Sequence, residues 1–218
     1  MSTVTTAPAT QRVPVAGVDL DVLRRGPGQP LLLLHGFEHI DPRLPIVDLL
    51  ARDAELLAPS HPGFGGTKRP KDFGTMYDLV HLYLEYIDTL PAGPITLMGI
   101  SFGGWLAAEI AVKAGRRIGK LILVDALGIK ISDRETPDIL DVFNAHPDDV
   151  VKKSWHDPAK NAPRYDDMED EELITISRNR KHSAATPFIP TCTTRNSSAG
   201  SASSRRAHWC CGAPPTVS

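Results

Sequence analysis

The chain has 218 residues, which is enough for one domain or for one domain with a small insertion. Its 41% hydrophobic and 23% charged residues are ordinary values for a globular protein, and a net charge of −2 argues against a partner bound through nucleic-acid phosphates. Apolar runs such as residues 31–34 are far too short to cross a membrane, and no secretory signal is visible, so we expect a cytoplasmic protein.

Charge is divided unevenly along the chain. All 26 Asp and Glu residues precede residue 173, and the remainder carries 6 Lys or Arg. From residue 183 onward, 24 of 36 residues are Ser, Thr, Ala, Pro or Gly. We expect 183–218 to be an irregular tail and 1–11 to be flexible. The cysteines, all in this tail, favour neither a disulfide framework nor a metal site: Cys192, Cys210 and Cys211.

The middle of the chain alternates between predicted strands and helices. Two segments around residues 16–17 predict a β-hairpin, and apolar runs predict strands buried on both faces of a parallel sheet. The buried strands are expected at 31–34, 95–100 and 121–124, a shorter strand at 54–58, and helices at 41–50, 77–90 and 102–114. This order is typical of parallel β-α-β units, which place their working residues at the carboxyl ends of the strands.

Residues 131–182 have an acidic, helical pattern, with helices expected at 139–143, 148–155 and 169–176. A helical segment inserted after a buried strand suggests a lid over the sheet. Alternatively, these helices are ordinary connections between strands. We therefore expect a core domain at 12–130 and a lid at 131–182.

One motif carries chemistry. Gly99-Ile100-Ser101-Phe102-Gly103 joins a predicted strand to a predicted helix. Gly-x-Ser-x-Gly in this setting is typical of a nucleophile elbow, a turn so tight that side chains at either glycine would collide with backbone. The turn holds the serine in a strained conformation at the cap of the next helix, whose dipole favours negative charge. Ser101 is the predicted nucleophile, and a helix-capping serine is the alternative.

A second motif, His35-Gly36-Phe37, directly follows the apolar run at 31–34. Acyl transfer needs two backbone N–H donors aimed at the developing oxyanion. We expect one from Phe102, the residue after the nucleophile, and the other from Phe37. His35 is expected to hydrogen-bond within its loop.

From about residue 12 to residue 180 the chain resembles the α/β-hydrolase family, on these motifs and on the loop Pro62-Gly63-Phe64-Gly65. The resemblance implies an α/β fold with a mostly parallel sheet, flanking helices and a lid. The sequence shows no segment that matches the last strands of that fold. It implies a carboxylesterase-like serine hydrolase that needs no metal or organic cofactor. The implied partner is a small-molecule ester or related acyl compound, with no nucleic acid or membrane, and the oligomeric state is left open. Ser60 stands where the family usually has Asp.

The family's remaining triad members, an acid followed by a histidine, are not identifiable. Asp125 ends a predicted strand and is a minor candidate for the acid. His182 falls too early for the base, and His208 follows no recognisable strand. The other histidines, His39, His61, His81, His146 and His156, are expected on the surface, in loops or in the lid.

The genetic code offers a reason for this gap. When the third base of each codon is joined to the first two of the next, His208-Trp209-Cys210-Cys211 must encode Leu-Val-Leu. The residues that follow then allow Trp-Gly-Ala-Ala-Asp, which looks like the family's missing strand with its acid. We hypothesise that the reading frame changes near residues 181–190.

Three functions stay open. The first is ester hydrolysis through an acyl-enzyme on Ser101, in a chain that is inactive as given if it lacks acid and base, since an unassisted hydroxyl is a poor nucleophile. The second is C–C bond hydrolysis of meta-cleavage type, because those hydrolases share the serine elbow. The third is a non-catalytic binding protein on a hydrolase fold. The lid aromatics Phe143, Trp155 and Tyr165 are expected to line an apolar pocket or to be ordinary packing.

Overall fold

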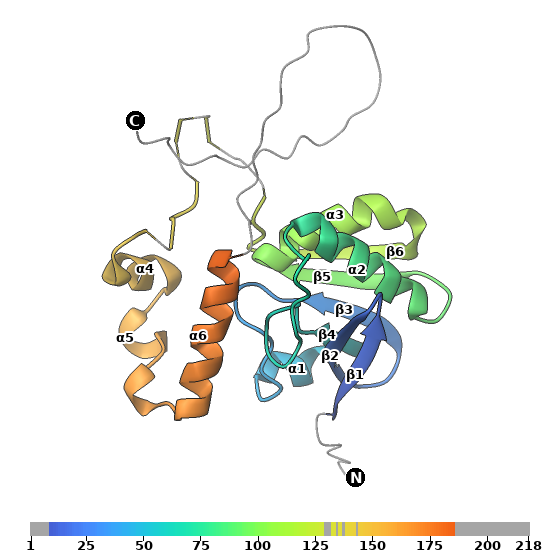
Figure 1. Cartoon of the computed structure of the whole chain (residues 1–218), viewed down its shortest axis with the longest axis horizontal. Coiled ribbons are helices and arrows are strands. Elements are labelled where there is room, and N and C mark those ends of the chain that lie inside the picture. Colours follow the sequence, from blue (N-terminus) through green and yellow to red (C-terminus); the bar gives the residue numbers. More distant parts are fainter. Residues whose placement is uncertain (1–8, 129–131, 134, 137, 143, 186–218) are drawn as a thin grey trace, which may run out of the picture. The chain divides into compact units, whose positions relative to one another are not determined.

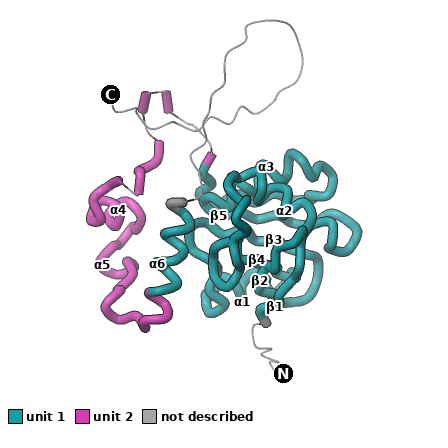
Figure 2. Tube along the Cα trace, in the orientation of Figure 1, with its two compact units in different colours: residues 1–127, 174–188 teal, residues 128–173, 189–218 magenta. Residues whose placement is uncertain are grey.

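The computed structural model describes residues 9–128, 132–133, 135–136, 138–142 and 144–185 (Figure 1). The strands are β1 (Ala9–Val15), β2 (Val18–Arg25), β3 (Gln29–Leu34), β4 (Ala54–Pro59), β5 (Ile95–Ile100) and β6 (Ile118–Val124). The helices are α1 (Pro45–Leu50), α2 (Met76–Thr89), α3 (Phe102–Ala114), α4 (Pro147–Ser154), α5 (Pro158–Asn161) and α6 (Asp170–Ala185). The chain divides into two compact units, residues 1–127 with 174–188 and residues 128–173 with 189–218 (Figure 2).

The strands of the first unit form one sheet in the order β1-β2-β4-β3-β5-β6. β1 and β2 make the predicted antiparallel hairpin, β2 is antiparallel to β4, and β4, β3, β5 and β6 run parallel. The expected mostly parallel sheet is therefore confirmed. Helices α2 and α3 lie side by side over the sheet (Figure 1).

β3 lies in the middle of this sheet. Leu31 and Leu33 pack in a core cluster with Val47 of α1, and alternation along the strand points Leu32 and Leu34 to the opposite face. Both faces are covered, because Leu32, Leu33 and Leu34 are 0% exposed. The buried strand predicted at 31–34 is confirmed.

β6 corrects one expectation. The apolar run at 121–124 is a strand, but it is not buried on both faces: Leu121 and Leu123 are 38% and 37% exposed. β6 is the outermost strand of the described sheet, next to β5 alone. An apolar run predicts a strand, whereas its burial depends on which neighbours the rest of the chain supplies.

The first helix also differs from its prediction. It begins at Pro45 rather than at 41–42, because the Asp41 carboxylate accepts hydrogen bonds from the Arg43 backbone and guanidinium in a turn that precedes the helix. Of the apolar side chains in the predicted range, Val47 is fully buried, while Leu44 and Leu49 are exposed.

In the second unit, α4 matches the helix predicted at 148–155, and α6 begins near the predicted residue 169. The described residues within 139–143 contain no helix, so that prediction is wrong there. This unit contains α6 only as far as residue 173, and the rest of α6 belongs to the first unit, whereas we expected the lid to reach residue 182. None of the described helices combines the length and the apolar character that a membrane crossing requires.

Candidate functional site

Ser101 lies on a sharp turn between the end of β5 and the start of α3. Its φ is +53°, in a region that non-glycine residues rarely adopt. The turn is held by hydrogen bonds to the end of β6: the Ser101 N–H donates to the Val124 carbonyl at 2.9 Å, and the Leu127 N–H donates to the Ser101 carbonyl at 3.0 Å. Ser101 occupies the cap position of α3, but its side chain makes no cap hydrogen bond, so the predicted capping role is not observed.

The glycines on either side are sterically required. A Cβ on Gly99 would overlap the backbone of Gly103, and a Cβ on Gly103 would overlap the carbonyl oxygens of Leu34 and His35. The helix therefore crosses the ends of β5 and β3 at backbone contact. This confirms the predicted strand-to-helix turn and explains its strain.

The loop after β3 packs against this turn. A Cβ built on Gly36 would lie 3.1 Å from the Ser101 Cβ and 3.5 Å from its Oγ. The rings of Phe37 and Phe102 stack with centroids 6.5 Å apart. The structure thus brings together the three residues that the sequence selected for the site: Ser101, Phe37 and Phe102.

A buried pair of histidines supports the same loop. The backbone N–H of His61 donates to the ring atom Nε2 of His35 at 2.9 Å. In return, the ring atom Nε2 of His61 donates to the backbone carbonyl of His35 at 2.9 Å. Within the loop, His35 Nδ1 donates to the Gly36 carbonyl at 2.8 Å, as expected. Burial lowers the pKa of His61 to about 4, and burial and the neighbouring His61 hold the pKa of His35 well below its usual value.

Sequence reasoning missed this role of His61. It lies in a loop, as predicted, but it is 1% exposed and joins two strand ends. No local pattern identifies this role, because the partners Tyr83 and His35 lie 22 and 26 residues away in the sequence. In the structure the Ser60 N–H donates to the Asp21 carbonyl at 2.8 Å, and the next residue, His61, makes the contacts to the loop after β3.

Helix α6 adds a second support. Asn179 is fully buried, and its Nδ2 lies 3.3 Å from Glu38 Oε2 and 3.1 Å from His39 Nδ1. Arg178 donates to the Gly65 carbonyl at 3.0 Å. His182 packs against Gly63, and burial, followed by the charge of Arg69, lowers its pKa. The three residues of α6, Arg178, Asn179 and His182, belong to the first unit, although we expected them in the lid.

The described part of the chain places no triad acid or base in a hydrogen bond to the serine hydroxyl. None of the described histidines hydrogen-bonds to the Ser101 hydroxyl, and His208 lies outside the described residues. Asp125 follows β6 with a φ of +43°, two residues before Leu127 in the turn that contacts the elbow. Of the lid aromatics, Trp155 and Tyr165 are exposed and Phe143 is outside the described residues.

Comparison with known proteins identifies the family. The chain matches the model described as "Alpha/beta hydrolase family" over residues 31–215, which extends past about residue 180, where we expected the resemblance to end. It is 29% identical over 135 residues to a 2-hydroxymuconate semialdehyde hydrolase of Pseudomonas sp. (strain CF600), which covers 59% of this chain and 47% of that protein. It is 32% identical over 95 residues to a poly(3-hydroxyalkanoate) depolymerase of Ectopseudomonas oleovorans, covering 43% and 34%.

The fold is also similar to that of a solved meta-cleavage product hydrolase from Pseudomonas fluorescens IP01. The TM-score is 0.57 at 22% identity, and the superposition covers 84% of this chain and 69% of the other. This likeness concerns the fold alone. The chain spans about half the length, or less, of the two curated relatives.

Proposed function

The chain belongs to the α/β-hydrolase family, and on that premise we propose that it is a serine hydrolase which cleaves small-molecule carboxylic esters through an acyl-enzyme on Ser101. The observation that carries the proposal is the strained turn at Ser101, with a φ of +53° and the Gly36 backbone packed against its side chain. A strained serine between a strand and a helix N-terminus is the arrangement that acyl transfer uses in this family.

In the proposed reaction Ser101 Oγ bonds to the ester carbonyl carbon, and the π electrons of the carbonyl move onto its oxygen. The N–H groups of Phe37 and Phe102 would stabilise that oxyanion. Collapse of the intermediate breaks the bond to the alcohol oxygen, which leaves with the serine proton. Water then attacks the acyl-enzyme in the same way and releases the acid and the free serine. Both steps need a general base, which the described residues do not place beside Ser101.

A second candidate is hydrolysis of a C–C bond next to a carbonyl group. It is favoured by the similarity to a hydrolase that is named for 2-hydroxymuconate semialdehyde, a compound with an aldehyde carbonyl. The same serine and oxyanion donors would serve this reaction, with a carbon leaving group in place of the alcohol.

Both candidates can be tested on one preparation. We expect hydrolysis of p-nitrophenyl esters of graded acyl length, and loss of that activity in Ser101→Ala. Turnover of 2-hydroxymuconate semialdehyde without ester cleavage would replace the first candidate by the second. If a protein folded by circular dichroism turns over neither, the hydrolase proposal is contradicted and non-catalytic binding is favoured.

A further inference from the structure

Three buried residues, Tyr83, His61 and His35, take no part in the proposed chemistry. The Tyr83 hydroxyl bonds to the His61 ring, two bonds between a ring and the backbone join His61 to His35, and the His35 ring bonds to the loop that carries Phe37. We propose that this histidine relay is a positioning device that sets the direction of the Phe37 N–H. The inference rests on the proposed function, in which that N–H is an oxyanion donor, and it names the residues that orient the donor.

The partners of each ring determine its protonation. A carbonyl oxygen can only accept, so His61 Nε2, 2.9 Å from the His35 carbonyl, carries a proton. The backbone N–H of His61 can only donate, so His35 Nε2 is unprotonated and His35 Nδ1 carries the proton that it donates to Gly36. In neutral His61, Nδ1 accepts a hydrogen bond from the Tyr83 hydroxyl at 2.5 Å. One tautomer is therefore fixed for each ring.

The last hydrogen bond of the relay acts on the oxyanion loop. The Gly36 carbonyl and the Phe37 N–H belong to one planar trans peptide unit, in which C=O and N–H point in opposite directions. Because His35 Nδ1 holds the Gly36 carbonyl, it also fixes the direction of the Phe37 N–H. The same peptide follows the Gly36 Cα, which lies against Ser101. His35 thus orients the loop amide next to the nucleophile without touching substrate.

The surroundings of the relay are apolar. The Phe64 ring meets His35 edge-on at 5.1 Å between centroids, and the Phe102 ring meets His61 in the same way at 6.0 Å. Burial raises the pKa of Tyr83 well above its usual value, so its hydroxyl keeps the proton that it donates. A charge on any member would be desolvated, which favours the neutral arrangement.

Titratable groups from neighbouring elements act in the same direction. His39 lowers the pKa of His35, and Tyr86 of α2 adds to the raised pKa of Tyr83.

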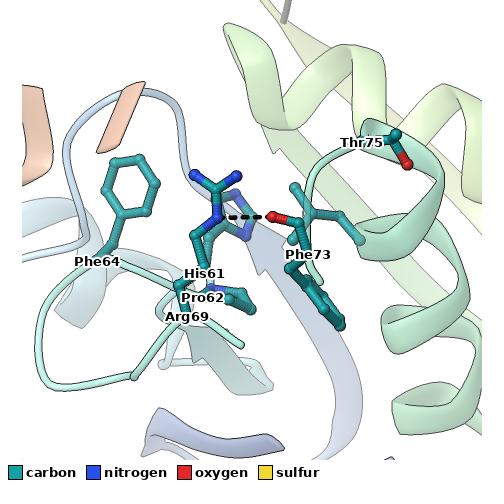
Figure 3. Close-up of a pocket in the computed structure, with 7 residues that line it drawn as sticks. His61, Pro62, Phe64, Arg69, Phe73 and Thr75 are labelled. Atoms are coloured by element: carbon teal, nitrogen blue, oxygen red, sulfur yellow. Dashed lines mark hydrogen bonds between the residues drawn. The ribbon is translucent and has the colours of Figure 1, made fainter. Parts of the chain in front are cut away.

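A small pocket lies beside the relay. Arg69 lines this pocket of about 10 Å³ together with His61, and its Nε donates to the Phe73 carbonyl at 2.7 Å (Figure 3). This volume is close to the space that one water molecule needs, so the pocket is no substrate site.

The first test removes the hydroxyl that begins the relay. In Tyr83→Phe the ring stays and the donor to His61 is lost, while Tyr86→Phe is a matched control on the same buried side of α2. The readout is inactivation by a fluorophosphonate probe, which separates the maximal rate from the half-saturating concentration. We expect the maximal rate to fall about tenfold in Tyr83→Phe alone, with half-saturation unchanged, since loss of a whole oxyanion donor costs ~100-fold or more.

The second test distinguishes orientation from simple packing. In His35→Asn the amide nitrogen takes the place of Nδ1 and can still donate to Gly36, whereas in His35→Gln the longer side chain reaches the position of Nε2. If His35 orients the loop, His35→Asn retains a higher maximal rate than His35→Gln, whichever of the two unfolds at the higher temperature. The reverse order of rates overturns the proposal.

NMR of the ring nitrogens tests the arrangement without relying on activity. At pH 7 we expect His35 as the Nδ1–H tautomer and His61 as the Nε2–H tautomer, with the Phe37 amide resonance shifted in Tyr83→Phe but not in Tyr86→Phe. His35 as the Nε2–H form, or equal labelling rates in both tyrosine variants, overturns the relay. A third outcome is that wild-type protein shows the expected tautomers but does not react with the fluorophosphonate. This result would support the geometry of the relay and contradict the proposed hydrolase function.

Discussion

β3 and β6 start from similar sequences and end in different surroundings. β3 ends in four leucines, and β6 ends in Leu121-Ile122-Leu123-Val124. In the structure the last three leucines of β3 are 0% exposed, whereas Leu121 and Leu123 of β6 are more than a third exposed. β3 lies between β4 and β5, while β6 has only β5 beside it in the described sheet.

A hydrophobic run therefore predicts that a segment forms a strand, but it does not predict whether neighbouring elements bury that strand. The candidate site lies at the ends of β3 and β5, two strands that have a neighbour on each side and are called here the inner strands. His35-Gly36-Phe37 follows β3, and Ser101 follows β5. There Gly99 and Gly103 lie against backbone and His35 lies against buried rings, so few residues fit at these positions. In β6 the exposed side chains of Leu121 and Leu123 have room, and most substitutions of these two residues should be tolerated.

The largest effect is expected where α3 crosses the inner strands. A Cβ in Gly103→Ala would overlap the carbonyl oxygens of Leu34 and His35, which cannot move without disturbing β3. We expect a loss of more than about 3 kcal/mol in urea unfolding, at or beyond the usual cost of overpacking. The control is Gly74→Ala, whose Cβ would meet nothing within 4 Å. Equal stabilities for the two variants would contradict the tight crossing.

The next effect compares the two strands directly. Leu33→Ala in β3 removes a 0% exposed side chain and should cost about 2–5 kcal/mol. Leu121→Ala in β6 removes a side chain that is 38% exposed and should cost less than about 1.5 kcal/mol. Both values come from urea titrations under one set of conditions. A larger loss at Leu121 would mean that β6 is covered in solution.

The third-largest effect is expected from acid, which should lower the free energy of unfolding through the buried side chain of His61. The pKa of His61 is about 4 in the folded protein and 6.5 ordinarily, so the unfolded chain binds its proton more readily. The contribution of His61 to stability is complete above pH 6.5 and is lost as the pH falls toward 4, by about 2 kcal/mol at pH 5.

Urea titrations at pH 7.5 and pH 5 measure this acid effect. His81→Gln, an exposed position on α2, should keep the same difference between the two pH values. An unfolding free energy that is equal at the two pH values would show that the pKa of His61 is not lowered in the folded protein.

The smallest effect is expected on the open side of β6. In Leu121→Lys the aliphatic part of lysine can cover the same surface while its charge reaches water. We expect the free energy of unfolding to change by less than about 1 kcal/mol, and a charged edge to reduce self-association, measured by light scattering. Stronger association in this variant would contradict the exposed placement of Leu121.

Much of the fold could be predicted, because its signals are local. The period of α2, the apolar runs of β3 and β5 and the glycines at 99 and 103 each report on neighbouring residues. The start of α1 was misplaced because the Asp41–Arg43 hydrogen bonds compete with the helix. The burial of β6 was wrong because it depends on elements distant in the sequence.

The site was predicted in part. Ser101, Phe37 and Phe102 carry a motif, and the structure places them together, although their roles stay predictions. Tyr83 and Asn179 carry no motif, since their contacts arise only when α2 and α6 pack on the loops. The reading-frame hypothesis for residues 183–218 also stays a prediction. The coding DNA tests it, because codons incompatible with the second frame would reject it.

The most direct test of the account is mass spectrometry of the folded chain after treatment with a fluorophosphonate. We expect one adduct, on the peptide that contains Ser101, and we expect it to disappear in Ser101→Ala. A folded protein without an adduct, or one whose adduct persists in Ser101→Ala, would contradict the claim that the turn after β5 presents a nucleophile.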